Sequence, residues 1–180
     1  MNMKGVKDKF NNFKNKILNE LFPENFTCNY CGAEIATANK YGLCENCVLE
    51  IKPIKFPCKI CGDELNSFTN VCDNCKNRKR YFDYAISTTT YDGVAKKIVH
   101  NLKYNNCAYL AKTIGAFLAD TFYSGKFNLI DIVICVPLSK EKRKVRGYNQ
   151  AEEILKEFVS YYGFDYNLDC LVRTKNTTTQ

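Results

Sequence analysis

Four C-x-x-C pairs between Cys28 and Cys75 constrain this chain more than any other feature of its sequence. They stand as C-x2-C-x12-C-x2-C followed by C-x2-C-x10-C-x2-C. The stretch "CNYCGAEI" recurs as "CKICGDEL", and "CENC" recurs as "CDNC", so the two sets form an internal repeat. Four thiolates around one ion give the closed tetrahedral site of a structural zinc. Segments this short have almost no apolar core, so metal binding must supply much of their folding free energy.

We therefore predict a double zinc ribbon with two structural Zn²⁺ ions, held by Cys28, Cys31, Cys44, Cys47, Cys58, Cys61, Cys72 and Cys75. We favour sequential grouping of the pairs, and interleaved grouping stays open at this point. Disulfides are disfavoured because no signal peptide or membrane-spanning run is visible, and we expect a cytoplasmic protein with reduced thiols. A rubredoxin-like iron site is a further alternative, although two such redox centres in tandem are less expected. Cys107, Cys135 and Cys170 lack partner spacing, and the last two are expected to be small core residues.

The charge is unevenly distributed along the 180 residues. The chain carries a formal net charge of +7, of which residues 28–75 contribute −2 and residues 76–180 contribute +7. Each Zn(Cys)4 centre adds further negative charge to the ribbons. Phosphate binding needs the opposite sign, so we interpret the ribbons as a scaffold or a protein-contact module.

Three regions follow from these patterns. Residues 1–24 are predicted to form an amphipathic helix that docks on the rest of the protein, with membrane-surface binding as the alternative. Residues 25–78 are the double zinc ribbon, and residues 79–180 form a second domain. Within that domain we expect strands at 85–91, 129–137 and 167–173, and helices starting at Asp92-Gly93 and covering 108–123 and 149–162. The 129–137 run is almost continuously apolar, so we expect that strand to be covered on both faces. The final strand, loop, helix and strand make a βαβ unit, so the fold class is α/β with a parallel sheet.

A cationic loop connects the 129–137 strand to the helix that follows it. The stretch "CVPLSKEKRKVRGYNQAE" (135–152) contains Lys140, Lys142, Arg143, Lys144 and Arg146, with Glu141 opposing them. Ligands of open α/β sheets bind at the carboxyl ends of strands, and a helix N-terminus there favours anions. The loop therefore suits a diphosphate, a triphosphate or a nucleic-acid backbone, with a solubilising surface loop as the alternative. No GxxxxGK[ST] occurs, so a P-loop nucleotide site is not supported. His100 is expected to lie on the surface.

Together with the ribbons, the stretches "YDGVAKKIVHNLKY", "VPLSKEKRKVRGYNQAEEI" and "LVRTKNTTTQ" resemble the ComF family of phosphoribosyltransferase-like proteins. The resemblance implies a double zinc ribbon followed by a type I phosphoribosyltransferase fold, which is Rossmann-like. It also implies a role in natural competence, the uptake and processing of transforming DNA. The implied partners are single-stranded DNA or a protein of the competence machinery. An active family member would use phosphoribosyl pyrophosphate (PRPP) as donor, together with Mg²⁺.

The resemblance also implies site residues. The turn that would contact pyrophosphate is Val136, Pro137, Leu138 and Ser139. The signature after it consists of Arg143, Arg146, Gly147, Tyr148, Asn149 and Gln150. Lys103 and Tyr104 match an element near the active-site hood, and Arg173 with Thr174 matches the start of a flexible loop.

One departure from the family pattern bears on catalysis. The next family elements would be an apolar strand ending in an acidic pair and a T-T-G-type turn that binds the ribose and 5′-phosphate of PRPP. Neither occurs before Gln180. We therefore expect the domain to be incomplete, with an exposed apolar sheet edge, and this chain alone not to be a competent phosphoribosyltransferase. The alternative is a non-enzymatic zinc-ribbon adaptor that contacts DNA through residues 76–80 and 140–146, or contacts competence proteins.

Overall fold

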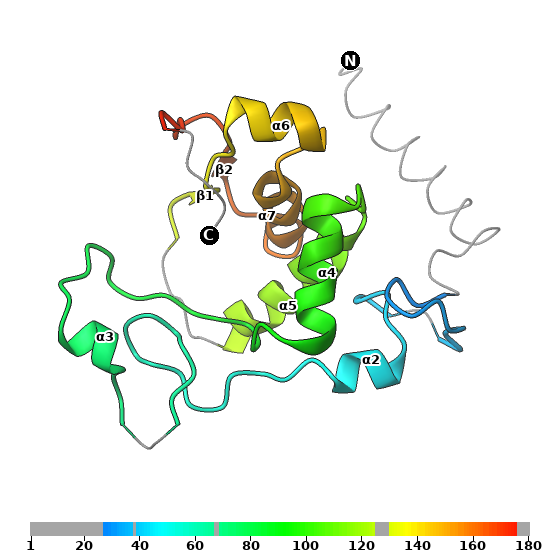
Figure 1. Ribbon diagram of the computed structural model, residues 1–180, viewed down its shortest axis with the longest axis horizontal. Coiled ribbons are helices and arrows are strands. Elements are labelled where there is room, and N and C mark those ends of the chain that lie inside the picture. Colours follow the sequence, from blue (N-terminus) through cyan, green and yellow to red (C-terminus); the bar gives the residue numbers. More distant parts are fainter. Residues whose placement is uncertain (1–26, 38, 67–68, 125–129, 176–180) are drawn as a thin grey trace, which may run out of the picture.

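The computed structural model describes residues 27–37, 39–66, 69–124 and 130–175. The predicted helix over residues 1–24 lies outside these ranges. Figure 1 shows α4 (Gly93–Tyr104), α5 (Leu110–Ser124) and α7 (Gln150–Ser160) at the centre, with α6 (Lys140–Arg146) above them. The two ribbons lie below, the first near α2 (Glu45–Leu49) and the second around α3 (Asp73–Lys76). No helix in the described ranges has the length and hydropathy of a membrane span.

The two ribbons repeat one local structure, as the sequence repeat predicts. In each ribbon a glycine with positive φ, Gly32 at 74° and Gly62 at 72°, follows the second cysteine. Its N–H donates to the carbonyl of the first cysteine at 2.9 Å, which closes the tight turn. The short helices α2 and α3 then begin directly after Cys44 and Cys72, the third cysteine of each set.

The first ribbon shares a core with the helices. Its buried residues Cys28, Ile35, Leu43 and Cys47 form one cluster with apolar residues of α4 and α5, among them Val94, Ile98, Leu102, Leu110 and Ala111. The Tyr41 ring stacks on Phe117 of α5 with centroids 4.3 Å apart. The Thr113 hydroxyl of α5 donates to the Tyr41 carbonyl at 2.6 Å. The first ribbon and the two helices are therefore one packed unit.

The second ribbon has a small core of its own, formed by Cys58, Leu65 and Cys75 with neighbouring side chains. The Ala85 N–H donates to the Ile60 carbonyl at 2.7 Å, which holds the following segment against the ribbon. Figure 1 shows this ribbon beside the helices, around α3. Its core thus depends mainly on its own cysteines.

α4 and α7 form where the sequence predicts them. α4 begins after Asp92, buries Val94, Ile98 and Leu102 along one face and leaves His100 exposed. α7 begins after Asn149, whose side-chain oxygen accepts from the Ala151 N–H at 3.1 Å. The third predicted helix, α5, starts at Leu110, two residues later than expected.

The sheet is parallel but small. β1 (Val133–Ile134) pairs with β2 (Tyr166–Asn167), with Val133 opposite Tyr166 and Ile134 opposite Asn167. α6 and α7 lie between the two strands in the chain, so the predicted βαβ unit and the α/β class are confirmed. The predicted extents, 129–137 and 167–173, were too long.

Three local predictions were wrong. Residues 85–91 form no strand, and a single bridge joins Thr89 to Pro53. The 129–137 run is covered on one face only, because α5 and α7 pack on Val133 and Cys135, whereas the alternate residues Ile130, Ile132, Ile134 and Val136 are exposed. These exposed side chains lie on a face of the run, whereas the expectation from the sequence was an exposed apolar edge of the sheet. Cys170 is exposed, so it is not a core residue.

Candidate metal centres and a cationic helix

The cysteine sulfurs gather into two tetrads in sequential order. Cys28, Cys31, Cys44 and Cys47 form one tetrad, and Cys58, Cys61, Cys72 and Cys75 form the other; the four sulfurs of each lie within 4.8 Å of one another. The Cys31–Cys44 and Cys61–Cys72 sulfurs are 3.6 Å and 3.7 Å apart. Tetrahedral zinc with bonds of about 2.3 Å places its sulfurs about 3.8 Å apart. Each tetrad therefore fits one structural zinc ion, and its role is to hold the ribbon together.

The backbone of each ribbon favours the thiolate form of the first cysteine, Cys28 or Cys58. The N–H groups of Cys61 and Cys72 lower the pKa of Cys58 to about 6, and the Cys72 nitrogen lies 3.3 Å from the Cys58 sulfur. Burial raises the pKa of Cys28, but hydrogen bonds from the backbone of Cys31 and Cys44 outweigh it and bring that pKa to about 6 as well. The knuckle turns thus present donors to the sulfurs before any ion binds.

The predicted cationic loop is a helix. Residues 140–146 form α6, in which no residue is buried. The Ser139 side chain caps its start by accepting from the Lys142 N–H at 3.3 Å, and Gly147, with φ 85°, ends it. Serine before the cations and glycine after them were visible in the sequence, so the capping signals for this helix were overlooked.

The signature residues after α6 contact one another across a buried network. The Arg143 guanidinium donates to both carboxylate oxygens of Glu152, at 2.8 and 3.0 Å. The Asn149 amide donates to Glu152 at 3.1 Å and to the Val136 carbonyl at 3.5 Å. Asn149 and Glu152 are buried, with 1% and 7% of their surfaces exposed. In this structure Arg143 is therefore held by Glu152, a residue that the sequence analysis did not single out although it is the acid that ends the "RGYNQAE" stretch.

Other signature residues join α6 to the end of α4. The Tyr148 hydroxyl donates to the Leu102 carbonyl, and Arg146 donates to the side-chain oxygen of Gln150. The Arg146 guanidinium also lies over the Tyr104 ring, 5.5 Å from its centroid. The geometry thus brings Tyr104 and Arg146 together.

A cleft of about 300 Å³ lies between the end of α4 and α6, lined by Lys103, Tyr104, Glu141, Lys142, Val145 and Arg146. The turn 136–139 follows β1 outside this lining; Val136 is exposed and the Ser139 hydroxyl is used as a helix cap. Arg173 is also outside the lining, and its Nε donates to the Lys175 carbonyl at 3.1 Å. The predicted site residues therefore divide between the cleft, the buried network and the turn after β1.

Comparison with known proteins supports the double zinc ribbon. The sequence pattern of the double zinc ribbon domain matches residues 17–77. The chain is 30% identical over 161 residues to competence protein F of Haemophilus influenzae, an alignment that covers 87% of this chain and 69% of that protein. It is 21% and 20% identical over 157 residues to the DNA utilization protein YhgH of Salmonella typhi and of Escherichia coli K12, covering 85% of this chain and 69% of each. No solved structure matches significantly.

These findings define a double zinc ribbon protein whose ribbons precede an α/β unit. The chain belongs to the ComF family.

Proposed function

We propose that this chain takes part in natural competence and handles incoming DNA by binding single-stranded DNA at α6. The observation that carries the proposal is that α6 presents five cations and one acid on a helix with no buried residue. The names of the relatives, competence protein F and DNA utilization protein, support the same process. The α6 surface has the sign that phosphate binding needs, whereas the two zinc tetrads carry negative charge.

The cations of α6 have different surroundings. Arg143 is engaged by Glu152 and Arg146 lies over Tyr104, whereas Lys140 and Lys144 are exposed on the helix. We assign phosphate contacts to Lys140 and Lys144. The cleft between α4 and α6 would contact the same strand beside the Tyr104 ring. Arg143 positions α6 against α7.

Binding of a labelled single-stranded oligonucleotide at several salt concentrations tests this proposal. For single strands, log K falls with log salt with a slope of about −0.7 per phosphate contact. The double substitution Lys140→Ala with Lys144→Ala is expected to weaken binding and to make this slope less negative by about 1.4. Lys96→Ala, which removes an exposed lysine near the other end of α4, is the matched control and should leave the slope unchanged.

Absent binding, or a slope that the double substitution leaves unchanged, contradicts the proposal. Such a result would favour a zinc-ribbon adaptor that contacts protein partners.

PRPP is a second candidate ligand, because the turn 136–139 follows the carboxyl end of β1, where ligands of parallel sheets bind. Mg²⁺ together with basic residues would stabilise the departing pyrophosphate. Isothermal titration of this chain with PRPP and Mg²⁺ tests the candidate. Micromolar binding would support a phosphoribosyltransferase site, and we expect none from this chain alone.

A further inference from the structure

The segment that leaves the second ribbon, "KNRKRYFDY" (76–84, here the aromatic linker), places four cations before three aromatic rings, with Asp83 between the last two rings. The rings of Tyr81, Phe82 and Tyr84 are 91%, 47% and 53% exposed. Grouped exposed aromatic residues mark a contact surface more often than a solvated connection. The proposed DNA contact at α6 does not involve these rings.

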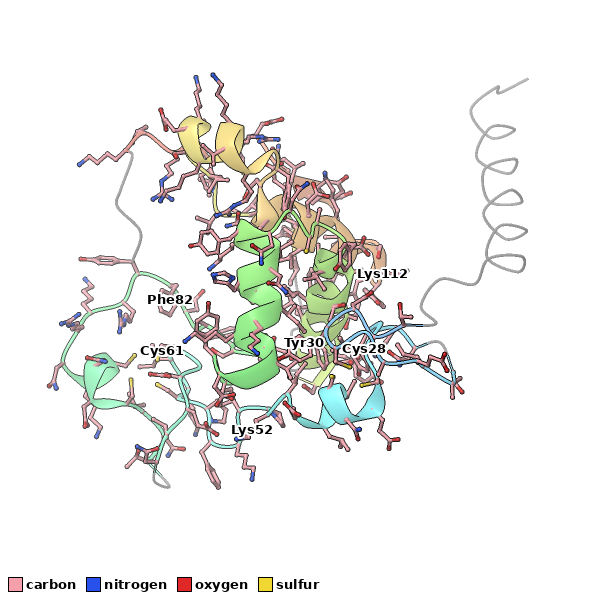
Figure 2. The ribbon with its side chains drawn as sticks, turned by 45° about the vertical axis from the view of Figure 1, so that its right-hand side comes forward. Cys28, Tyr30, Lys52, Cys61, Phe82 and Lys112 are labelled. Carbon is pink, nitrogen blue, oxygen red and sulfur yellow. The ribbon has the colours of Figure 1, made fainter. Side chains whose placement is uncertain are left out.

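The second ribbon holds the aromatic linker at both ends. At the start, Lys76 is the last residue of α3, the helix of the ribbon itself. At the far end, the Ala85 N–H donates to the Ile60 carbonyl at 2.7 Å. Gly62 makes this second contact possible, because a Cβ there would lie 2.8 Å from the Ala85 oxygen. Figure 2 shows Phe82 and Cys61 in this same part of the molecule, away from Cys28.

The linker cations divide between the ribbon and the solvent. Arg80 is partly buried, and Lys76 pairs with Asp73 at 2.9 Å. Arg78 and Lys79 are exposed, and the Lys79 ammonium lies 5.6 Å from the centroid of the Tyr81 ring. Two cations therefore accompany the exposed rings on the solvent side, although the ribbon behind them is acidic.

From this arrangement we infer that the aromatic linker is a second contact for single-stranded nucleic acid. Tyr81 and Phe82 stack on bases, while Arg78 and Lys79 contact the flanking phosphates. The inference rests on the proposed DNA-handling function and deepens it. The strand must be single, because duplex bases are already stacked and their faces are closed to the rings. Arg78 and Lys79 are exposed beside the first ring, and contact with a polyanion uses these cations whereas contact with an apolar protein surface does not.

The chain contains no tryptophan, so Tyr81→Trp introduces a single fluorescent reporter into the linker. We would titrate this variant, as the full zinc-loaded chain, with an oligothymidylate of about 20 nucleotides, a length that exceeds one typical single-strand site. An abasic strand of equal length and charge is the companion ligand. We expect quenching by the oligothymidylate and little by the abasic strand, because stacking needs bases.

Affinities of alanine variants complete the test. Tyr81→Ala and Phe82→Ala are each expected to weaken oligothymidylate binding about 5-fold or more, and to leave the salt slope unchanged because no charge is lost. Tyr123→Ala, which removes an exposed ring from the end of α5, is the matched control and should bind as the unaltered chain does. A zinc content of two per chain in each variant shows that the ribbons are intact.

The outcomes separate the two proposals. If Tyr81→Ala and Phe82→Ala both bind the oligothymidylate as tightly as the unaltered chain, and binding still depends on salt, the linker inference is wrong. The α6 proposal then stands, and the exposed rings contact a protein partner. Equal weakening for the oligothymidylate and the abasic strand also overturns stacking. If the unaltered chain binds neither strand, the proposed function fails first.

Discussion

Among single residues, Glu152 and Asn149 show how the family signature stabilises the fold. Both are buried, and together they connect the end of β1, through the Val136 carbonyl, to Arg143 of α6 and to the first turn of α7. A buried carboxylate is tolerated when it is paired and hydrogen-bonded, and Glu152 accepts three bonds. These side chains set the position of α6 before any ligand binds.

The substitution Glu152→Gln tests this role. It removes the charge that holds Arg143 and should lower the free energy of unfolding by about 1–2 kcal/mol, less than for a fully buried pair because the Arg143 side chain is half exposed. Glu153→Gln is the matched control, since Glu153 only pairs with Lys156 one turn away, and should change stability by at most about 0.5 kcal/mol. Urea unfolding of the zinc-loaded chains measures both. Equal effects would show that the network stabilises nothing.

The two knuckle glycines allow a paired comparison. Both have positive φ, so alanine at either costs about 1–2 kcal/mol in backbone strain. At Gly32 a Cβ would meet nothing within 4 Å, whereas at Gly62 it would lie 2.8 Å from the Ala85 oxygen and 2.9 Å from Ile86. We expect Gly62→Ala to speed hydrogen exchange at the Ala85 amide, and Gly32→Ala to leave that amide unchanged. Identical exchange in both variants would contradict the close contact.

Between elements, the clearest contact joins the first ribbon to α5. Asp120 of α5 accepts from the Lys40 ammonium and from the Tyr41 hydroxyl, the latter at 2.6 Å. The hydrogen bond with Asp120 raises the pKa of Lys40. Burial first, and then the hydrogen bond with Asp120, raises the pKa of Tyr41. The contact of Asp120 with Lys40 and Tyr41 therefore stabilises the packing of the first ribbon on α5 as long as Lys40 and Tyr41 are protonated.

The pH dependence of this contact has a definite sign. A group whose pKa is higher in the folded state stabilises the fold below its unfolded pKa and loses that contribution as the pH rises through the folded value. We therefore expect the stability difference between the unaltered chain and Asp120→Asn, about 1 kcal/mol, to stay constant from pH 7 to 9. It should decline above about pH 10.5.

Thermal unfolding across this range measures the difference. Asp131→Asn, at an exposed aspartate of the sheet region, serves as the control. A difference that grows above pH 10.5 would reverse the predicted sign.

Over the whole molecule, the two zinc sites have unequal surroundings. Cys28 and Cys47 of the first site belong to the apolar core that includes α4 and α5. The second site is part of a separate small core, and we assign it the role of presenting the aromatic linker. The tandem ribbons are alike in sequence but support different parts of the fold.

Removal of each zinc separately tests this inequality. Cys31→Ser and Cys61→Ser change the second cysteine of each ribbon, so the two substitutions are matched. Each should reduce the zinc content from two ions to one. Cys31→Ser should also lower the melting temperature of the helices, because α4 and α5 lose part of their shared core, whereas Cys61→Ser should leave the helical transition in place. Circular dichroism with a zinc-sensitive dye follows both effects, and equal loss of helix would contradict the unequal roles.

The sequence alone was sufficient for the features that depend on neighbouring residues. Knuckle spacing sets the four cysteine pairs, apolar periodicity with Asp92 and Asn149 at the helix starts sets α4 and α7, and the alternation of these patterns sets the βαβ order. The grouping of the cysteine pairs into sequential tetrads was favoured by the sequence and decided by the structure. Family membership followed from the same local motifs. The capping of α6 was local too, and Ser139 and Gly147 could have predicted that helix.

Tertiary structure decided what depends on distant partners. Strand length depends on a neighbour to pair with, so only Val133–Ile134 of a long apolar run is strand, and Thr89 makes one bridge where a strand was expected. Whether Arg143 faces a ligand or a carboxylate was decided by the packing of α7, which brings Glu152 to it across nine positions of sequence. A side chain's charge can be read from the sequence, but its partner is determined by the elements that pack around it.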